Sequence, residues 1–144
     1  LGDLEQAIDY QSRAVDLTPD DHPNLPGRLT NLAISYKNRF HRLGDLGDLD
    51  KAIQYSSHAL DLTPDGHSYL PSRLTNLGAY YSDRFKRLGE LGDLENAIQY
   101  DSRALALTPD GHPGLSQRLS NLGVSFKDQF QRLGELTDLE RAIQ

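Results

Sequence analysis

The feature that most constrains the fold is an internal repeat of 45 residues. The segments LGDLEQAI, LGDLDKAI, LGDLENAI and LTDLERAI begin at Leu1, Leu46, Leu91 and Leu136. Of the 45 positions, 23 are identical in all three full copies, and no insertion or deletion separates the copies. Self-similarity at a fixed period is typical of one structural unit stacked on itself. The sequence therefore predicts a single array with repeats at 1–45, 46–90 and 91–135 and a partial fourth repeat at 136–144.

The first half of each repeat has a helical pattern, represented in the second copy by DLDKAIQYSSHALDL at 48–62. Its apolar residues recur at steps of three, four and seven, so they share one face of a helix. Asp48 is expected to be the N-cap of this helix. Thr63 and Pro64 are expected to end it, because proline cannot donate the next backbone hydrogen bond and restricts the residue before it.

The second half of each repeat predicts another helix, represented by LPSRLTNLGAYYSDRFKRLG at 70–89. Pro71 suits the first turn, and Gly89 suits the left-handed position just past the end. Gly78, like Ala33 and Gly123 in the other copies, is expected to allow close approach of a neighbouring helix. One helix pair cannot bury both of its apolar faces, so the pairs are expected to stack into an all-α, right-handed α-solenoid.

The two ends of the chain interrupt this pattern. The first helix is expected from about Asp3 to Leu17, and the last is expected to begin at Asp138 and to run for two turns. The chain has no initiator methionine and stops within an apolar pattern, which suggests a fragment of a longer protein.

Composition excludes several classes of function. The chain has no cysteine, which excludes disulfides, thiolate zinc sites and a cysteine nucleophile. With 15 basic against 21 acidic residues, the net charge of −6 argues against nucleic acid as a partner. No apolar run approaches the ~20 residues that span a bilayer, so no membrane partner is expected. A cytoplasmic location is the expectation.

The repeat also argues against catalysis. An enzyme gathers different residues in different roles at one place, whereas this chain offers the same residues at three places. No glycine-rich phosphate loop, His-Glu-x-x-His motif or nucleophile elbow is present in the sequence. We expect no enzymatic activity, no cofactor and no metal.

The motif NLGAYY, together with AIQYSSHALDLTP and its equivalents in the other copies, resembles the tetratricopeptide repeat. In that family a Leu-Gly-x-x-Tyr helix is paired with an Ala-x6-Ala helix that ends at a proline. The matching residues here are Leu77, Gly78, Tyr81, Ala97, Ala104 and Pro109. The period of 45 exceeds the family's usual 34, so the chain looks most like the long-period arrays of the kinesin light chain type. It is also similar to arrays in large fungal proteins that carry a CHAT peptidase or a nucleotide-binding switch domain.

The resemblance implies that the Leu-Gly-bearing helices line a concave groove that binds an extended peptide. The residues beside the apolar stripe of these helices are the candidate groove residues: Thr30, Asn31, Ile34, Lys37, Asn38, Thr75, Asn76, Ala79, Ser82, Asp83, Ser120, Asn121, Val124, Lys127 and Asp128. The asparagine is identical in every copy, and its amide can both donate to and accept from a peptide backbone. The alternative is that each asparagine bonds the adjacent repeat and only sets the stacking.

Three other sets of residues are of types that can carry chemistry. The arginines, represented by Arg28, Arg73 and Arg118, could hold an acidic partner, but a solvated face paired with Asp and Glu is favoured. The aromatic residues Tyr36, Tyr81 and Phe126 are expected in the core. The histidines of the PDGHP loops, His22, His67 and His112, are expected to bond the loop backbone, because equivalent positions in stacked helices lie too far apart to share one metal.

The sequence thus predicts a scaffold that binds a protein or an extended peptide, as the recognition or sensor region of a larger multidomain protein. The alternative is a structural array that self-associates head to tail through its repeat ends.

Overall fold

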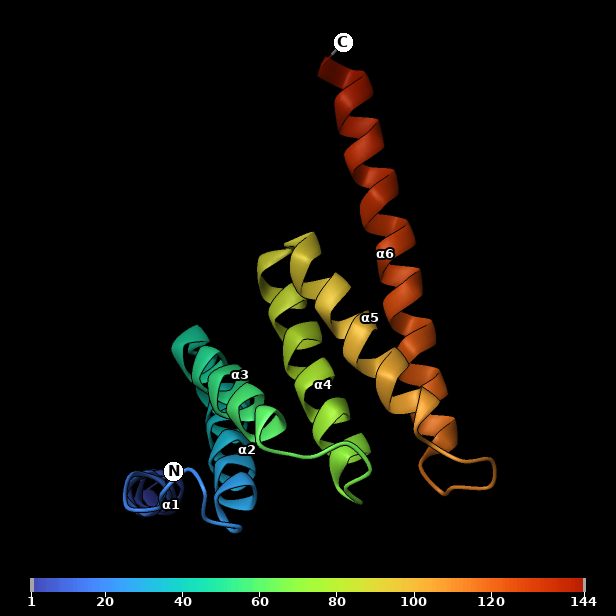
Figure 1. The fold of residues 1–144 in the computed structure, drawn as a ribbon. Coiled ribbons are helices and arrows are strands. Elements are labelled where there is room, and N and C mark those ends of the chain that lie inside the picture. The colour runs from blue at the N-terminus through green and yellow to red at the C-terminus, as the bar shows by residue number, and fades with distance from the viewer. Residues whose placement is uncertain (1, 144) are drawn as a thin grey trace.

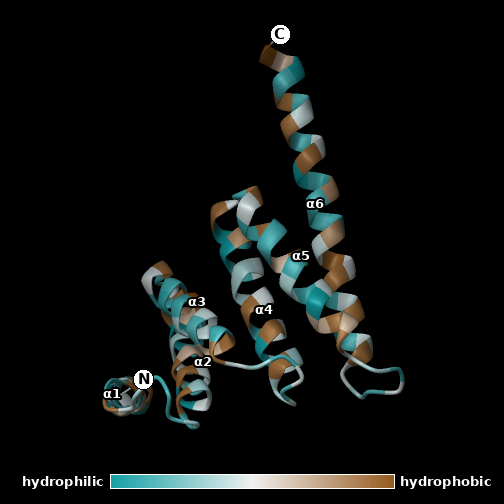
Figure 2. Cartoon of the chain, in the orientation of Figure 1, coloured by the Kyte–Doolittle hydropathy of each residue, from teal (hydrophilic) through white to brown (hydrophobic). Residues whose placement is uncertain are grey.

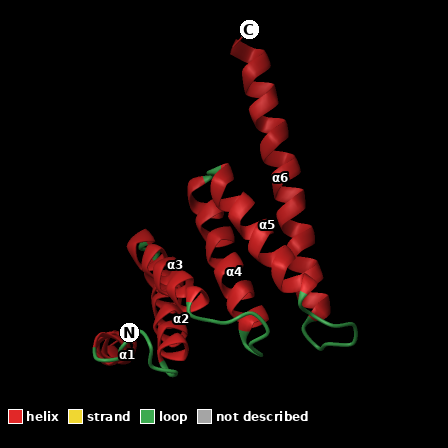
Figure 3. Cartoon of the chain, viewed as in Figure 1, coloured by secondary structure: helices red, strands yellow, loops and turns green. Residues whose placement is uncertain are grey.

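The computed structural model describes residues 2–143, so Leu1 and Gln144, the ends of the predicted array, lie outside the described residues. Six helices follow one another in this part of the chain, joined only by turns and loops (Figure 3). They are α1 (Gly2–Asp16), α2 (Leu25–Leu43), α3 (Leu46–Asp61), α4 (Leu70–Leu88), α5 (Leu91–Ala106) and α6 (Leu115–Ile143). None of these helices is both long and apolar enough to cross a membrane.

The helices stack side by side into a helical repeat solenoid, which confirms the predicted all-α class (Figure 1). The long loops before α2, α4 and α6 lie at one edge of the stack, and the short turns after α2 and α4 lie at the other. The most extensive contacts join α2 to α3 and α4 to α5. The tightest helix pairs therefore cross the repeat boundaries that were placed after residues 45 and 90.

The core is a continuous band of leucines between the helices. Each helix carries apolar and polar residues on different faces, visible as brown and teal stripes in Figure 2. The largest fully buried side chains are Leu25, Leu29, Leu32, Leu49, Leu74, Leu77 and Leu94. Tyr36 is buried and stacks on Tyr55, whereas Tyr81 is half-buried and stacks on Tyr100. The expectation that Phe126 is core is wrong, because it lies on α6, the last helix of the stack, and is half exposed.

The ends of the helices follow the predicted signals at most positions. Pro71 lies in the first turn of α4, and Gly89, with φ 70°, ends the helix by donating its backbone N–H to the carbonyl of Phe85. Gly44 ends α2 in the same way, with φ 72°.

The prediction that Asp48 caps α3 is wrong. The helix begins at Leu46, and its cap is the side chain of Asp45, three residues before Asp48. The Asp45 side chain accepts the backbone N–H of Gly47 at 2.8 Å. Asp48 is 4% exposed and accepts two hydrogen bonds from Arg39, at 2.8 and 3.0 Å. The sequence pattern failed here because a carboxylate near the start of a helix can accept either a backbone N–H, as an N-cap, or a side-chain donor of a neighbouring helix. Tertiary packing determines which of the two it does.

The same ion pair recurs in the next repeat. Arg84 of α4 donates twice to Oδ1 of the buried Asp93 of α5, at 2.8 and 3.0 Å. Each pair joins the end of one helix to the start of the helix that folds back against it. Each pair joins a half-buried arginine to a buried carboxylate, which is costly to leave without its partner, so the pair favours the turn between the two helices.

The third repeat lacks this pair, and its helix does not turn. The expectation of a separate helix from Asp138 is wrong, because α6 runs without a break through Gly134 to Ile143. Gln129 occupies the position of Arg39 and Arg84 in the earlier repeats. The arginine that pairs with Asp48 and Asp93 therefore has no equivalent that could pair with Asp138. Gly134 keeps a negative φ, unlike Gly44 and Gly89.

Candidate functional site

The fifteen candidate groove residues all lie on α2, α4 and α6, and none of them is buried. Because equivalent residues of the three helices are 45 positions apart, they form rows that cross the stack. Burial of neighbouring leucines fixes the rotation of each helix and leaves these residues on an accessible face.

The structure brings six of the candidates together in one cleft between α4 and α6, with a volume of about 340 Å³. These six are Ala79, Ser82 and Asp83 from α4 and Ser120, Asn121 and Val124 from α6. The cleft is completed by Lys86, Gln117, Ser125 and Asp101, of which Asp101 comes from the intervening helix α5.

Other candidates lie elsewhere on the stack. Asn31 lines a second cleft, between the loops before α2 and α4, and Asn38 lines a third beside the start of α1. The hydroxyl groups of Thr30 and Thr75 donate to the carbonyls of Pro26 and Pro71 in their own helices, at 2.8 and 2.9 Å. These two hydroxyls therefore have a local partner already.

The three equivalent asparagines leave hydrogen-bonding capacity unused. Oδ1 of Asn121 accepts from Nε2 of Gln117 at 2.8 Å, one turn earlier in the same helix. Within residues 2–143, the side chains of Asn31 and Asn76 make no hydrogen bond to a neighbouring repeat. A role in setting the stacking would require such bonds.

Asp101 is the buried acidic residue among the four lining residues that the sequence did not predict. It is 6% exposed, and no hydrogen bond or ion pair to it exists among residues 2–143. Burial raises the pKa of its carboxyl to about 6. The available signal was a variable position, occupied by Gln11, Ser56 and Asp101 in the three copies.

Gly78 makes room for this carboxylate. A Cβ at residue 78 would collide with Oδ1 of Asp101 and would lie 3.4 Å from the carbonyl oxygen of Ala97. The predicted role of Gly78 in close helix approach is therefore confirmed, whereas Gly123 on α6 has no such neighbour within 4 Å. The first copy combines Ala33 with the smaller Ser56 at these positions.

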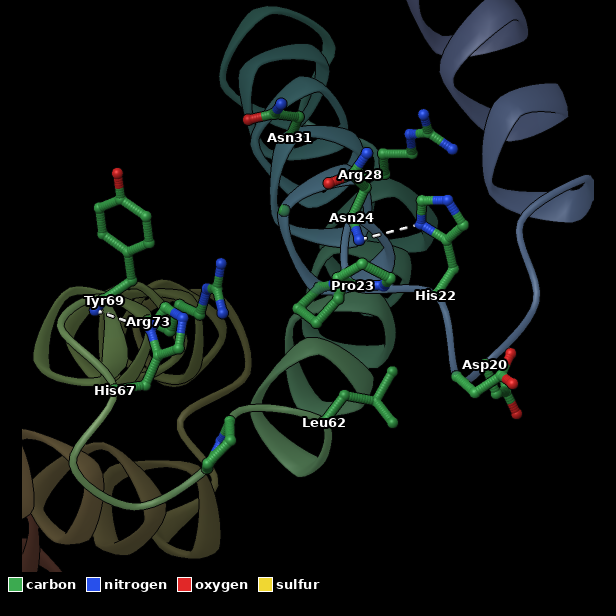
Figure 4. A pocket seen from close by; sticks show the side chains of 14 residues that line it. Asp20, His22, Pro23, Asn24, Arg28, Asn31, Leu62, His67, Tyr69 and Arg73 are labelled. Atoms are coloured by element: carbon green, nitrogen blue, oxygen red, sulfur yellow. Dashed lines mark hydrogen bonds between the residues drawn. The ribbon is translucent and has the colours of Figure 1, made fainter.

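The PDGHP loops form the second cleft, of about 660 Å³, shown in Figure 4. Nδ1 of His22 accepts the backbone N–H of Asn24 at 3.0 Å, and Nδ1 of His67 accepts that of Tyr69 at 3.1 Å. His112 repeats the arrangement with Gly114 at 2.9 Å. The prediction that these histidines bond the loop backbone is confirmed. In the described part of the chain, no group of three or more His, Asp or Glu residues is arranged to hold a metal ion.

The arginines at the starts of α2, α4 and α6 hold these loops in place. Arg28, Arg73 and Arg118 each donate to the hydroxyl of a threonine ten residues earlier, Thr18, Thr63 or Thr108. Each threonine hydroxyl in turn donates to the carbonyl four residues before it. The expectation of a solvated face is wrong for Arg73, which is only 9% exposed, because the loop threonine draws it into the stack.

Comparison with known proteins places this fold among repeat proteins. The tetratricopeptide repeat family matches residues 1–21 and 43–65. The structure is similar to the crystal structure of BtubC (BKLC) from P. vanneervenii, with a TM-score of 0.69 and 23% sequence identity over 99% of the chain. The chain spans 57% of the length of that protein. No curated protein matches the sequence. The partial family match and the shared fold together support an array of tetratricopeptide repeats.

Proposed function

We propose that the face formed by α2, α4 and α6 binds an extended protein segment, and that Asn31, Asn76 and Asn121 grip its backbone. The observation that carries this proposal is a row of asparagine amides on an accessible face, none of which bonds a neighbouring repeat within residues 2–143. A side-chain amide can donate to a peptide carbonyl and accept from a peptide N–H at once. It therefore holds backbone without selecting side chains.

The cleft between α4 and α6 adds a concave element to this face. Serine, asparagine and glutamine side chains line it together with three charged residues, and Val124 and Ala79 supply apolar contact. Pockets that combine apolar lining with a few polar groups are typical of binding sites. The array would then be the recognition region of a larger multidomain protein.

The test is selection from a display library of unstructured 16-residue peptides. We expect the unmodified chain to enrich a set of peptides, and the triple variant Asn31→Ala, Asn76→Ala, Asn121→Ala to bind them at least tenfold more weakly. Alanine favours the helix slightly over asparagine, so the variant should stay folded. The matched control replaces Asp9, Gln54 and Gln99, three equivalent and exposed residues of α1, α3 and α5, with alanine. Equal binding by the unmodified chain and the asparagine variant would contradict the proposal.

A second candidate function, head-to-tail self-association, is favoured by the exposed apolar face of α6. Phe40 on α2 is 7% exposed, whereas its equivalent Phe130 on α6 is 80% exposed. In the stack, Phe40 belongs to the core cluster that includes Leu49 and Ile53 of the following helix. The start of α1 has the sequence of α3 and α5, so α1 of a second copy has the pattern needed to cover this face.

This alternative predicts an open, concentration-dependent assembly, because the two contacting surfaces differ. Light scattering over a concentration series would show a rising mean mass, and Phe130→Glu would suppress the rise. A constant monomer mass over the series would contradict self-association and leave the groove proposal intact.

A further inference from the structure

The cleft between α4 and α6 is lined by an aspartate, Asp101, that has no hydrogen-bond or ion-pair partner among residues 2–143. Asp101 lies on α5, which runs between α4 and α6 (Figure 1). The residue lines the cleft although it is only 6% exposed. A buried polar group normally has an internal hydrogen bond, and an unpaired buried carboxylate is costly. A carboxylate held in this way is suited to a ligand that supplies the missing donors.

Two positions at this cleft differ between the second and third copies. Tyr80 of α4 is buried, and its equivalent on α6 is Ser125, which lines the cleft. At the second position, Ser56 on α3 is replaced by Asp101 on α5. The second copy thus combines the large Tyr80 with the neutral Ser56. The third copy combines the small Ser125 with the acidic Asp101. Space and negative charge are introduced together at this one place.

Two other charged residues face the cleft, both from α4. Asp83 lies 3.5 Å from Nε2 of His41, across the neighbouring gap between α2 and α4. Lys86 also borders the cleft. Among the described residues, its ammonium group forms no ion pair with Asp83 or Asp101. The residues that α6 contributes to the cleft are uncharged. Two carboxylates against one ammonium leave an excess of negative charge.

We propose that this cleft receives a basic side chain, lysine or arginine, of the bound segment, with the carboxylate of Asp101 accepting its N–H groups. This inference rests on the proposed function and adds side-chain selectivity to a groove that otherwise holds backbone. Charge-assisted hydrogen bonds to a carboxylate are about twice as strong as neutral ones, and the low exposure of Asp101 limits screening by salt. Ser82, Ser120 and Asn121 supply further acceptor oxygens for the same cation.

The experiment reads the sequences of the peptides that the display library yields. The unmodified chain should enrich peptides with one position that is lysine or arginine at least fivefold above its library frequency. Asp101→Asn keeps the size of the side chain and removes the charge, so it should still select peptides but lose that position. Ser125→Tyr recreates the arrangement at Tyr80 and should also lose the preference for a basic residue. Lys86→Ala removes the competing cation and should keep that preference.

The outcomes separate this inference from the function on which it rests. Enriched peptides without a basic position, or a basic position that survives in Asp101→Asn, would overturn the inference alone. A library that yields no peptide on the unmodified chain would overturn the proposed function, and the inference with it. Equal helical circular dichroism of all variants confirms that a lost preference does not reflect a lost fold.

Discussion

At the scale of single residues, the identical and the variable positions of the repeat serve different roles. The identical Thr63, His67 and Arg73 all bond loop or neighbouring side chains and build the corner of the repeat. Asp101 occupies a position that differs in every copy, and its burial depends on Gly78 and on the packing of three helices. Helical spacing alone cannot reveal that burial, because it identifies a face and not the depth of a side chain.

The raised pKa of Asp101 predicts a pH-dependent cost to stability. The pKa lies near 3.8 for an ordinary aspartate and is raised to about 6 in the folded chain. The folded state therefore disfavours the charged form, and the cost is absent below about pH 4 and complete above about pH 6. A difference of about 2 units corresponds to about 3 kcal/mol at 1.36 kcal/mol per unit.

Asp101→Asn should therefore raise the free energy of unfolding by up to about 3 kcal/mol at pH 7.5. The gain should shrink towards zero as the pH falls through 6 to 4. Urea denaturation of both proteins at these pH values measures the difference, in which all other titrating groups cancel. If the variant were less stable than the unmodified chain at pH 7.5, or if its gain in the free energy of unfolding were the same at pH 4 and pH 7.5, Asp101 would not be buried as an unpaired carboxylate.

The threonine of each loop corner predicts a second effect. Thr63→Val removes the acceptor of Nη1 of Arg73, a 2.8 Å bond, and leaves a buried guanidinium N–H unpaired. The expected loss of stability is about 1–3 kcal/mol. Thr30→Val is the control, because its hydroxyl bonds only a carbonyl of its own helix. Equal thermal unfolding midpoints for the two variants would argue against the relay from Arg73 to Thr63.

At the scale of helices, the sequence predicts where most of them are but not where every one of them ends. Pro71 and Gly89 act through their own backbone restrictions, so their effects could be predicted locally. The start of α3 coincides with an ion pair between Asp48 and an arginine of the preceding helix, and the continuity of α6 coincides with the loss of that arginine. That contact is nine residues away along the chain and follows from tertiary packing.

Gln129→Arg should make α6 turn back at Gly134. Arginine at this position restores the pair that Arg39 and Arg84 make, here with Asp138. Spin labels on cysteines introduced at Ser116 and Glu140 report the change without interference, because the chain has no cysteine. In the continuous helix 24 residues separate them, or about 36 Å, and in the folded-back arrangement the distance is about 22 Å.

Double electron–electron resonance measures both distances. The unmodified chain should give a distribution near 36 Å, and Gln129→Arg should populate the shorter distance. Gln129→Lys, which supplies charge without the planar fork, should have a smaller effect. A distribution that is the same for all three proteins would show that the ion pair does not decide whether the helix turns.

At the scale of the whole molecule, the repeat predicts the class of fold because each unit must cover the apolar face of its neighbour. The same reasoning places the fifteen candidate residues on an accessible face, as the structure has them. It does not predict that only six of them gather in the cleft of α4 and α6. Whether a cleft remains between two helices depends on differences in side-chain size between the copies, such as Tyr80 in the second and Ser125 in the third. The pattern that the copies share does not contain these differences.

The central claim is that the face of α2, α4 and α6 is the binding surface. The most direct measurement is a nuclear magnetic resonance titration of the labelled chain with an enriched peptide from the display library. We predict that the side-chain amide signals of Asn31, Asn76 and Asn121 shift together and saturate with one dissociation constant. If these three signals stay in place while signals of the outer residues of α1, α3 and α5 shift, the groove is not where the chain binds.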